Sequence, residues 1–179
     1  DDKKKRFIDE FKVSAYEATI LVSDIETAKY FEEVVAKMGK NRDMKLAVNW
    51  ITGELFAILN NKNLEISESP ISAKNLAKLI NLIKNGTISG KIAKTIFELM
   101  MDGDKDPQII VEEKGLKQQS DPKALEALID KIIDDNREKA IEYKNGKEKL
   151  FGFFVGQAMK VSGGKANPQL INEILKKKL

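Results

Sequence analysis

Residues that start helices stand before almost every stretch of apolar residues with helical spacing, and this pattern limits the fold more than any other feature of the sequence. Ser14 with Glu17 has the spacing of a capping box, as does Ser23 with Glu26. In a capping box the serine oxygen accepts a hydrogen bond from the N–H three residues on, and the glutamate carboxylate accepts one from the serine's own N–H. Further N-cap candidates are Ser72, Ser89, Asp106, Asp121 and Asn167, and a proline directly follows the last three. The serines are therefore expected to cap helices and not to act as nucleophiles.

Apolar residues recur at the spacing of buried helix faces, and no segment keeps the period of two that marks a strand. The predicted buried faces consist of Ile25, Ala28, Phe31, Val34 and Val35; of Leu46, Trp50, Leu55 and Leu59; of Leu76, Leu79, Ile80 and Ile83; and of Leu125, Leu128, Ile129, Ile132 and Ile133. Gly53, in the second of these, is expected to let a neighbouring helix approach closely. The chain is therefore predicted to be all-α, with helices over roughly 3–12, 15–21, 24–37, 43–60, 73–84, 90–101, 107–114, 122–134, 137–144, 147–161 and 168–178.

A polar stretch rich in turn-forming residues, from Met101 to Pro107, predicts a domain boundary. It divides a larger multi-helix domain, residues 1–104, from a smaller helical bundle, residues 105–179.

The residue types that are missing exclude several kinds of site. The sequence contains no His and no Cys, which rules out a Ser-His-Asp triad, a Cys-His pair, disulfides and thiolate or imidazole metal sites. No constellation of acidic residues points to a catalytic site or a metal site. No apolar run approaches the ~20 residues that cross a bilayer, and the basic start at residues 3–6 lacks the features of a signal peptide. A cytoplasmic location without membrane contact is expected.

Positive charge is concentrated near the C-terminus. Residues 1–104 are neutral overall, so the net charge of +3 lies in residues 105–179. Residues 144–179 contain eight lysines, and the acidic residues in this stretch are Glu148 and Glu173. This excess indicates a polyanionic partner, although a solvated lysine-rich surface explains it equally well.

Three glycine-containing stretches are candidates for contacts with phosphate. Residues 85–94 form a turn leading into a capped helix that carries Lys91 and Lys94, a setting that suits either a phosphate or a plain helix hairpin. Its glycine spacing does not match a P-loop. Residues 162–171 contain Gly163, Gly164 and Lys165, a turn that either meets a phosphate backbone or simply reverses the chain.

The remaining stretch, residues 144–160, has two glycines four positions apart, Gly152 and Gly156. Each glycine costs a helix about 1 kcal/mol relative to alanine. Either a second helix packs closely against this face, or the face is offered to a bulky partner such as nucleic acid. Phe151 and Phe154 could stack on bases, but their apolar neighbours favour a place in the core.

Five short motifs resemble the GatB/YqeY family. They are Asn49-Trp50, Gly86–Lys94, Val111–Leu116, Tyr143–Lys160 and Gly164–Pro168. Each is weak alone, but together they keep the family's order and spacing, and the resemblance extends from about Phe11 to Leu175. It implies a helical domain followed by a small YqeY-like tail.

The resemblance implies a part in an enzyme of translation. The family's long member is the B subunit of a heterotrimer that converts Glu-tRNA(Gln) to Gln-tRNA(Gln) and Asp-tRNA(Asn) to Asn-tRNA(Asn), using ATP, Mg²⁺ and glutamine. Its ATP-dependent step belongs to an N-terminal cradle domain, and a separate amidase subunit supplies ammonia. This chain matches the part beyond the cradle, and its start at Asp1 suggests a piece excised from a longer protein.

By this resemblance the chain itself is expected to be non-catalytic, to need no cofactor and to help select the tRNA. Its expected partners are tRNA(Gln) or tRNA(Asn) and, through the parent subunit, the amidase and a small third subunit. Two alternatives stay open: a docking module whose glycines receive a partner helix, and a stand-alone YqeY-like protein. An independent enzyme acting on aminoacyl-tRNA is disfavoured, because the sequence lacks His and Cys.

The predicted RNA contact surface is a set of lysines and glycines from the last two stretches. It comprises Lys147, Lys149, Gly152, Gly156, Lys160 and Lys165, with Lys91 and Lys94 as a secondary phosphate contact. If residues 147–161 form one helix, Lys147 and Lys149 lie about 200° apart around it. At least one of the two is then off any single row of phosphates.

Overall fold

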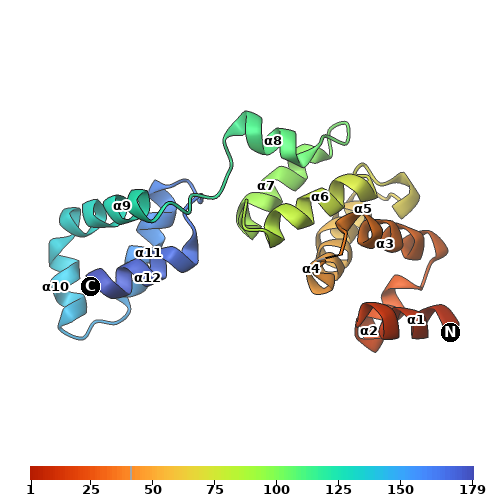
Figure 1. The fold of residues 1–179 in the computed structure, drawn as a ribbon, viewed down its shortest axis with the longest axis horizontal. Coiled ribbons are helices and arrows are strands. Elements are labelled where there is room, and N and C mark those ends of the chain that lie inside the picture. The colour runs from red at the N-terminus through yellow and green to blue at the C-terminus, as the bar shows by residue number, and fades with distance from the viewer. Residues whose placement is uncertain (41) are drawn as a thin grey trace. The chain divides into compact units, whose positions relative to one another are not determined.

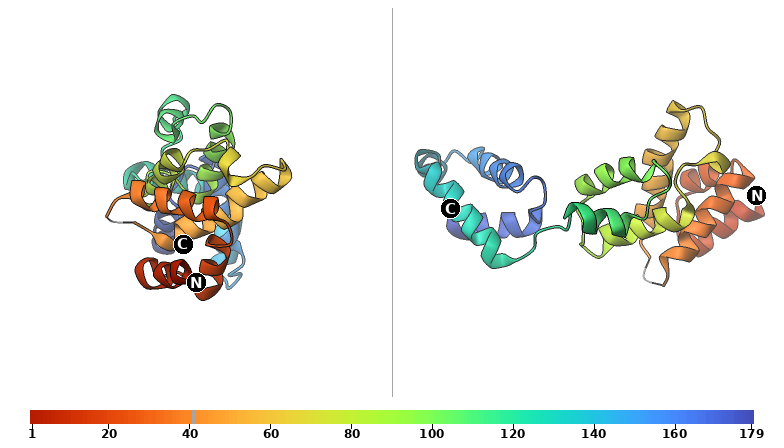
Figure 2. Two further views of the ribbon diagram at one scale, coloured as in Figure 1. Left: turned by 90° about the vertical axis from the view of Figure 1, so that its right-hand side faces the viewer. Right: turned by 90° about the horizontal axis from the view of Figure 1, so that it is seen from above.

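The computed structural model describes residues 1–40 and 42–179, which form a series of helices joined by turns and loops (Figures 1 and 2). The helices are α1 (Asp2–Phe11), α2 (Ala15–Leu21), α3 (Ile25–Met38), α4 (Met44–Asn49), the π-helical η1 (Trp50–Leu55), α5 (Phe56–Asn61), the 3-10 turn η2 (Ile66–Glu68), α6 (Ala73–Lys84), α7 (Gly90–Met100), α8 (Pro107–Lys114), α9 (Pro122–Asp135), α10 (Arg137–Lys144), α11 (Leu150–Val161) and α12 (Pro168–Lys178). No strand forms among the described residues, where an isolated bridge joins Gln119 to Ala166. The predicted all-α class is confirmed.

The chain folds as two compact units. The first unit comprises residues 1–86 and 93–114, and the second, here called the tail unit, comprises residues 87–92 and 115–179. Helix α8 packs on α6, so residues 107–114 group with the first unit although the sequence placed them in the second domain. The expected division at residue 104 into separately folding domains stays a prediction.

The polar stretch between α7 and α8 is fastened to α6. The backbone N–H of Ser72 donates to Oδ1 of Asp104 at 2.9 Å, and the side-chain amide of Asn75 donates to the same carboxylate at 3.0 Å. Lys78 forms an ion pair with Asp106 at 2.6 Å. Turn-forming composition alone therefore did not reveal how tightly this stretch is held.

Most of the predicted caps are formed. Ser14 and Glu17 make the expected capping box, at 3.1 and 2.8 Å. The box predicted for Ser23 and Glu26 is wrong: Asp24 caps α3 instead, and the Ser23 hydroxyl donates to the Ile20 carbonyl. Asp24 takes the position because it directly precedes the first helical residue.

Two expectations about packing in the first unit are also wrong. Ile25, predicted to be buried, is 68% exposed, because it lies at the first residue of α3 beyond the helices that cover Ala28 and Phe31. The second concerns Gly53. The predicted helix over residues 43–60 forms as α4, η1 and α5 in unbroken succession, and its middle is π-helical. Gly53 lies in this π-helical part, and a Cβ built on it would have no atom within 4 Å. It therefore does not accommodate a neighbouring helix.

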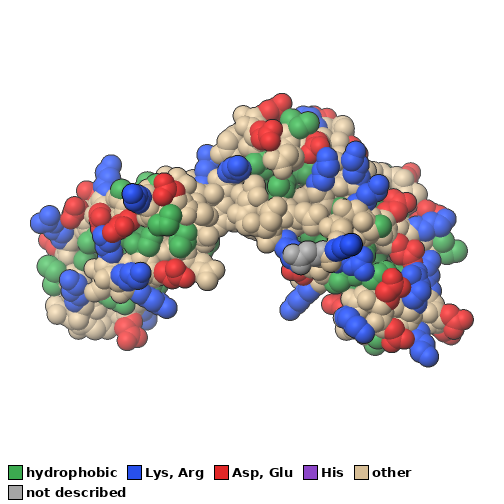
Figure 3. Space-filling model, viewed as in Figure 1, with side chains coloured by type: hydrophobic (Ala, Val, Ile, Leu, Met, Phe, Trp, Pro, Cys, Tyr) green, Lys and Arg blue, Asp and Glu red, His purple; other side chains and the backbone are tan. Residues whose placement is uncertain are grey.

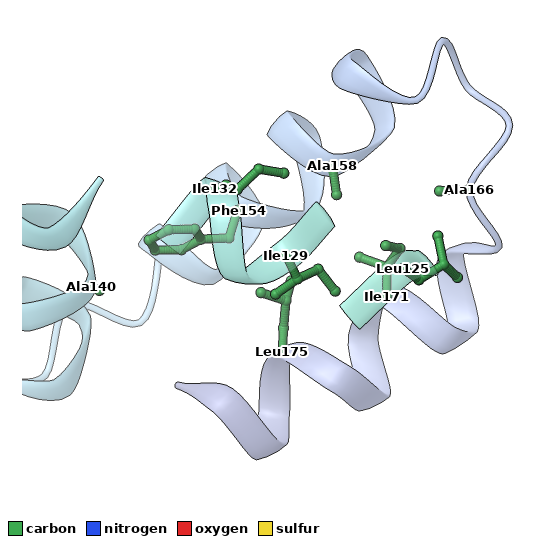
Figure 4. Packing of buried hydrophobic residues seen from close by; sticks show 9 residues of the cluster. All are labelled: Leu125, Ile129, Ile132, Ala140, Phe154, Ala158, Ala166, Ile171 and Leu175. Carbon is green, nitrogen blue, oxygen red and sulfur yellow. The ribbon is translucent and has the colours of Figure 1, made fainter. Parts of the chain in front are cut away.

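The tail unit has a core shared by α9, α11 and α12, which pack against one another in pairs. Figure 4 shows the side chains of these helices pointing toward a common centre. The buried residues of this core are Leu125, Ile129, Ile132, Ala140, Phe154, Ala158, Ala166, Ile171 and Leu175. Lys178, near the end of α12, contacts Glu126 and Asp130 of α9, both at 2.9 Å. Among the described residues, no helix is long and apolar enough to cross a membrane.

Candidate nucleic-acid interface

Helix α11 starts three residues later than the sequence indicated. Lys147 to Lys149 form a turn ahead of Leu150, and the backbone of Lys149 already has helical angles. Lys147 is held in the turn by a hydrogen bond from its N–H to the carbonyl of Glu142, at 3.1 Å. Because Lys147 precedes the helix, the angle expected between it and Lys149 does not apply.

One side of α11 is buried and the opposite side is bare. Phe154 and Ala158 are fully buried in the core of the tail unit, as predicted for Phe154, while Phe151 is half-buried. At about 100° per residue, Gly152 and Gly156 lie on the side opposite Phe154 and Ala158. Lys149 and Lys160 share that side, at its two ends. We call Lys149, Gly152, Gly156 and Lys160 the glycine face.

No part of the tail unit covers the glycine face. Both glycines are exposed, and a Cβ built on either would meet no atom within 4 Å, apart from the backbone of its own helix turn. Of the two explanations for these glycines, close packing by another helix of the tail unit is therefore not what occurs. Alanine would fit the same space and favour the helix by about 1 kcal/mol at each position.

Ion pairing separates the predicted lysines into two groups. Lys147 pairs with Glu142 at 2.8 Å, and Lys94 pairs with Glu54 at 3.5 Å. The others form no ion pair with any of the described residues: Lys91, Lys149, Lys160 and Lys165. The face of the tail unit seen in Figure 3 mixes basic, acidic and apolar side chains. The absence of a carboxylate partner, and not a continuous positive field, therefore distinguishes the candidate lysines.

The glycine-rich turn after α11 reverses the chain with its own hydrogen bonds. Gly163 and Gly164 have φ of +65° and +80°, and their N–H groups donate to the carbonyls of Lys160 and Met159, at 3.1 and 2.8 Å. The next two N–H groups, of Lys165 and Ala166, donate to the carbonyl and the hydroxyl of Ser162. These four N–H groups already donate hydrogen bonds within the turn. The groups of this turn that can donate to a phosphate are therefore side chains.

The predicted N-cap of α7 is present. The N–H of Ile92 donates to the Ser89 hydroxyl at 3.2 Å. The first turn of α7 belongs to the tail unit and the rest of the helix to the first unit. Lys91 and Lys94, predicted as one secondary contact, therefore belong to different units.

The comparison with protein families decides the membership of the chain. Residues 29–179 match the family model described as the GatB domain. The chain belongs to this family. The GatB/YqeY resemblance drawn from the five short motifs is thereby confirmed.

Three proteins similar to this GatB domain are considerably longer than it is. The chain is 96% identical over its whole length to 36% of the B subunit of the aspartyl/glutamyl-tRNA(Asn/Gln) amidotransferase of Pelagibacter ubique. It is 50% identical over its whole length to 37% of the protein of the same name from Thioalkalivibrio sulfidiphilus. It is also 50% identical, over 99% of its length, to 36% of the one from Ehrlichia chaffeensis. The chain thus spans little more than a third of these relatives.

One side chain beside the glycine face of this GatB domain was missed in the sequence. Phe153 is half-buried next to Gly152, and the Lys139 ammonium lies 3.8 Å from the centre of its ring. The lysine makes a cation–π contact with one face of this ring, so that a base could stack only on the opposite face. The available signal was the seven-residue spacing of Phe153 from Lys160, which places both on one side of a helix.

Proposed function

We propose that this GatB domain is a non-catalytic tRNA-binding module of an aspartyl/glutamyl-tRNA amidotransferase, and that its glycine face contacts the RNA. The names of the similar proteins supply the class of enzyme and of substrate. The observation that carries the site is the bare helix surface of Gly152 and Gly156 between two lysines that no described carboxylate pairs with.

The glycine face has the properties that RNA recognition needs. Double-stranded RNA is bound mainly through its shape, phosphates and 2′-hydroxyls. Gly152 and Gly156 lie one helical turn apart and have no side chains, so the helix backbone can approach a rigid, bulky surface closely. Lys149 and Lys160 lie eleven residues apart, roughly 16 Å along the helix axis, and can contact separate phosphates.

In this proposal, the chemical steps of the amidotransferase take place on other parts of the enzyme. The chain lacks His and Cys, and the described residues include no group of three or more His, Cys, Asp or Glu side chains that could hold a metal ion. We therefore place no step involving ATP, Mg²⁺ or glutamine on this chain. The amidase and the small third subunit are proposed partners of the longer parent subunit.

Filter binding tests the proposal. The chain is titrated with tRNA(Gln), tRNA(Asn) and a non-cognate tRNA at 50 and 200 mM salt. We expect tighter binding of the first two and a steep loss of affinity with salt, because each lysine–phosphate contact releases counterions. The double variant Lys149→Gln, Lys160→Gln is expected to bind more weakly and with a smaller salt dependence. Lys147→Gln is the matched control, since Lys147 already pairs with Glu142.

A docking module for a partner helix is the second candidate, and the same open glycines favour it. A helix packed through apolar contacts is insensitive to salt. Salt-independent capture of the amidase or the third subunit, together with an absence of tRNA binding, would establish docking and refute the RNA proposal.

A further inference from the structure

Three segments that are far apart in the sequence are joined by backbone hydrogen bonds within the tail unit. The N–H of Gln118 donates to the carbonyl of Thr87 at 2.6 Å. The N–H of Gln119 donates to the carbonyl of Lys165, also at 2.6 Å, and its carbonyl accepts from Asn167 at 2.9 Å. The first turn of α7 is thereby placed beside the glycine-rich turn that follows α11.

Lys91 lies along this glycine-rich turn. A Cβ built on Gly164 would be 3.8, 3.9 and 4.0 Å from Cδ, Cε and Nζ of Lys91. Gly164 is buried and has a φ of +80°. The end of the Lys91 side chain therefore lies over the backbone of the turn at Gly164, the residue before Lys165.

Neither of these lysines has an opposite charge beside it among the described residues. Lys91 and Lys165 appear in none of the ion pairs, whereas Lys94, one turn further along α7, pairs with Glu54. A turn that holds two lysines without a carboxylate partner has a local excess of positive charge, and such an excess favours the binding of an anion. The N–H groups of Gly163 and Gly164 are already bonded within the turn, so the side chains would supply the binding.

We propose that Lys91 and Lys165 together contact the sugar–phosphate backbone of the tRNA held on the glycine face. This inference rests on the proposed function. The glycine face ends at Lys160, whose carbonyl accepts from Gly163 at 3.1 Å, so the pair continues the contact surface past the end of α11. The RNA-binding surface then includes a residue of α7, well before residue 105, where the sequence placed the start of the tail.

The test compares two lysines of α7 that carry the same charge. Lys91→Gln and Lys94→Gln are each titrated with tRNA(Gln) and tRNA(Asn) at 50 and 200 mM salt. The Lys91→Gln variant is expected to bind more weakly, and its loss of affinity between the two salt concentrations should be smaller by a factor of about 3, as for one lost phosphate contact. The Lys165→Gln variant should show the same two changes. The Lys91→Arg variant should bind as tightly as the parent chain, because it keeps the charge. The Lys94→Gln variant should have the affinity and salt dependence of the parent chain.

The outcomes separate this inference from the function on which it rests. If Lys91→Gln matches Lys94→Gln while the Lys149, Lys160 double variant weakens binding, the second contact is refuted and the glycine face stands. If the parent chain binds no tRNA in a salt-dependent manner, both proposals fail. Because Lys91 is exposed, unchanged thermal unfolding is expected and excludes misfolding as the cause of weaker binding.

Discussion

Replacing Gly156 by alanine is expected to stabilise the tail unit and to weaken tRNA binding at the same time. Gly156 lies within α11, its φ is outside the left-handed region, and a Cβ there would meet no atom within 4 Å. The substitution therefore adds helix propensity, about 1 kcal/mol, without a clash. For a unit of roughly 70 residues, this raises the midpoint of thermal unfolding by about 4–8 °C.

The effect on binding has the opposite sign. A methyl group forced into a close contact costs about 1–3 kcal/mol, which is a 5- to 150-fold weaker complex if Gly156 touches the RNA. Thermal unfolding followed by circular dichroism measures the first effect, and filter binding of tRNA(Gln) and tRNA(Asn) measures the second.

Gly163 provides the matched control. It is exposed and lies two residues beyond α11, but its φ is +65°. Alanine at Gly163 must adopt the left-handed conformation, which costs roughly 1–2 kcal/mol, so this variant should unfold at a lower temperature. If Gly156→Ala is more stable and still binds as tightly as the parent chain, the glycine face is not the RNA contact. If Gly156→Ala is less stable, the inference that its surroundings are open is wrong.

Three further variants test the packing and the charges of the two units. Phe154→Ala empties a fully buried site in the core of the tail unit and should lower its free energy of unfolding by about 3–5 kcal/mol, measured by urea denaturation; a loss below 1 kcal/mol would contradict that burial. The hydrogen bond from Lys78 holds the pKa of Asp106 below 3.8, so the stability it supplies is present above pH 3.8 and is lost as the pH falls through the lower folded value. Lys78→Gln should raise this pKa toward 3.8 in a carboxyl NMR titration, and an unchanged value would refute the assigned cause. Lys178→Gln removes the contact of α12 with α9 and should speed amide hydrogen exchange in the last turn of α12, whereas Lys177→Gln should leave it unchanged.

The sequence by itself determined the helices and most of their caps. The hydrogen bonds of a cap close within three residues, as between Ser14 and Glu17, so nearby residue types specify them. The one cap predicted wrongly, at Ser23, is an error of a single position within the same local pattern. The family, too, could be identified from short motifs, since these are properties of the chain and not of its packing.

Burial and charge pairing were decided only by the tertiary structure. The periodicity that correctly predicted burial for Phe31 also predicted it for Ile25, which is exposed in the folded chain. Likewise no local pattern distinguishes Lys91 from Lys94. Lys91 lies against Gly164, more than seventy residues away in the sequence, and Lys94 pairs with Glu54, forty residues away. A side chain's surroundings depend on which distant segments the fold brings beside it. The sequence could therefore name the candidate residues, but it could not show which of them are buried or paired with an opposite charge.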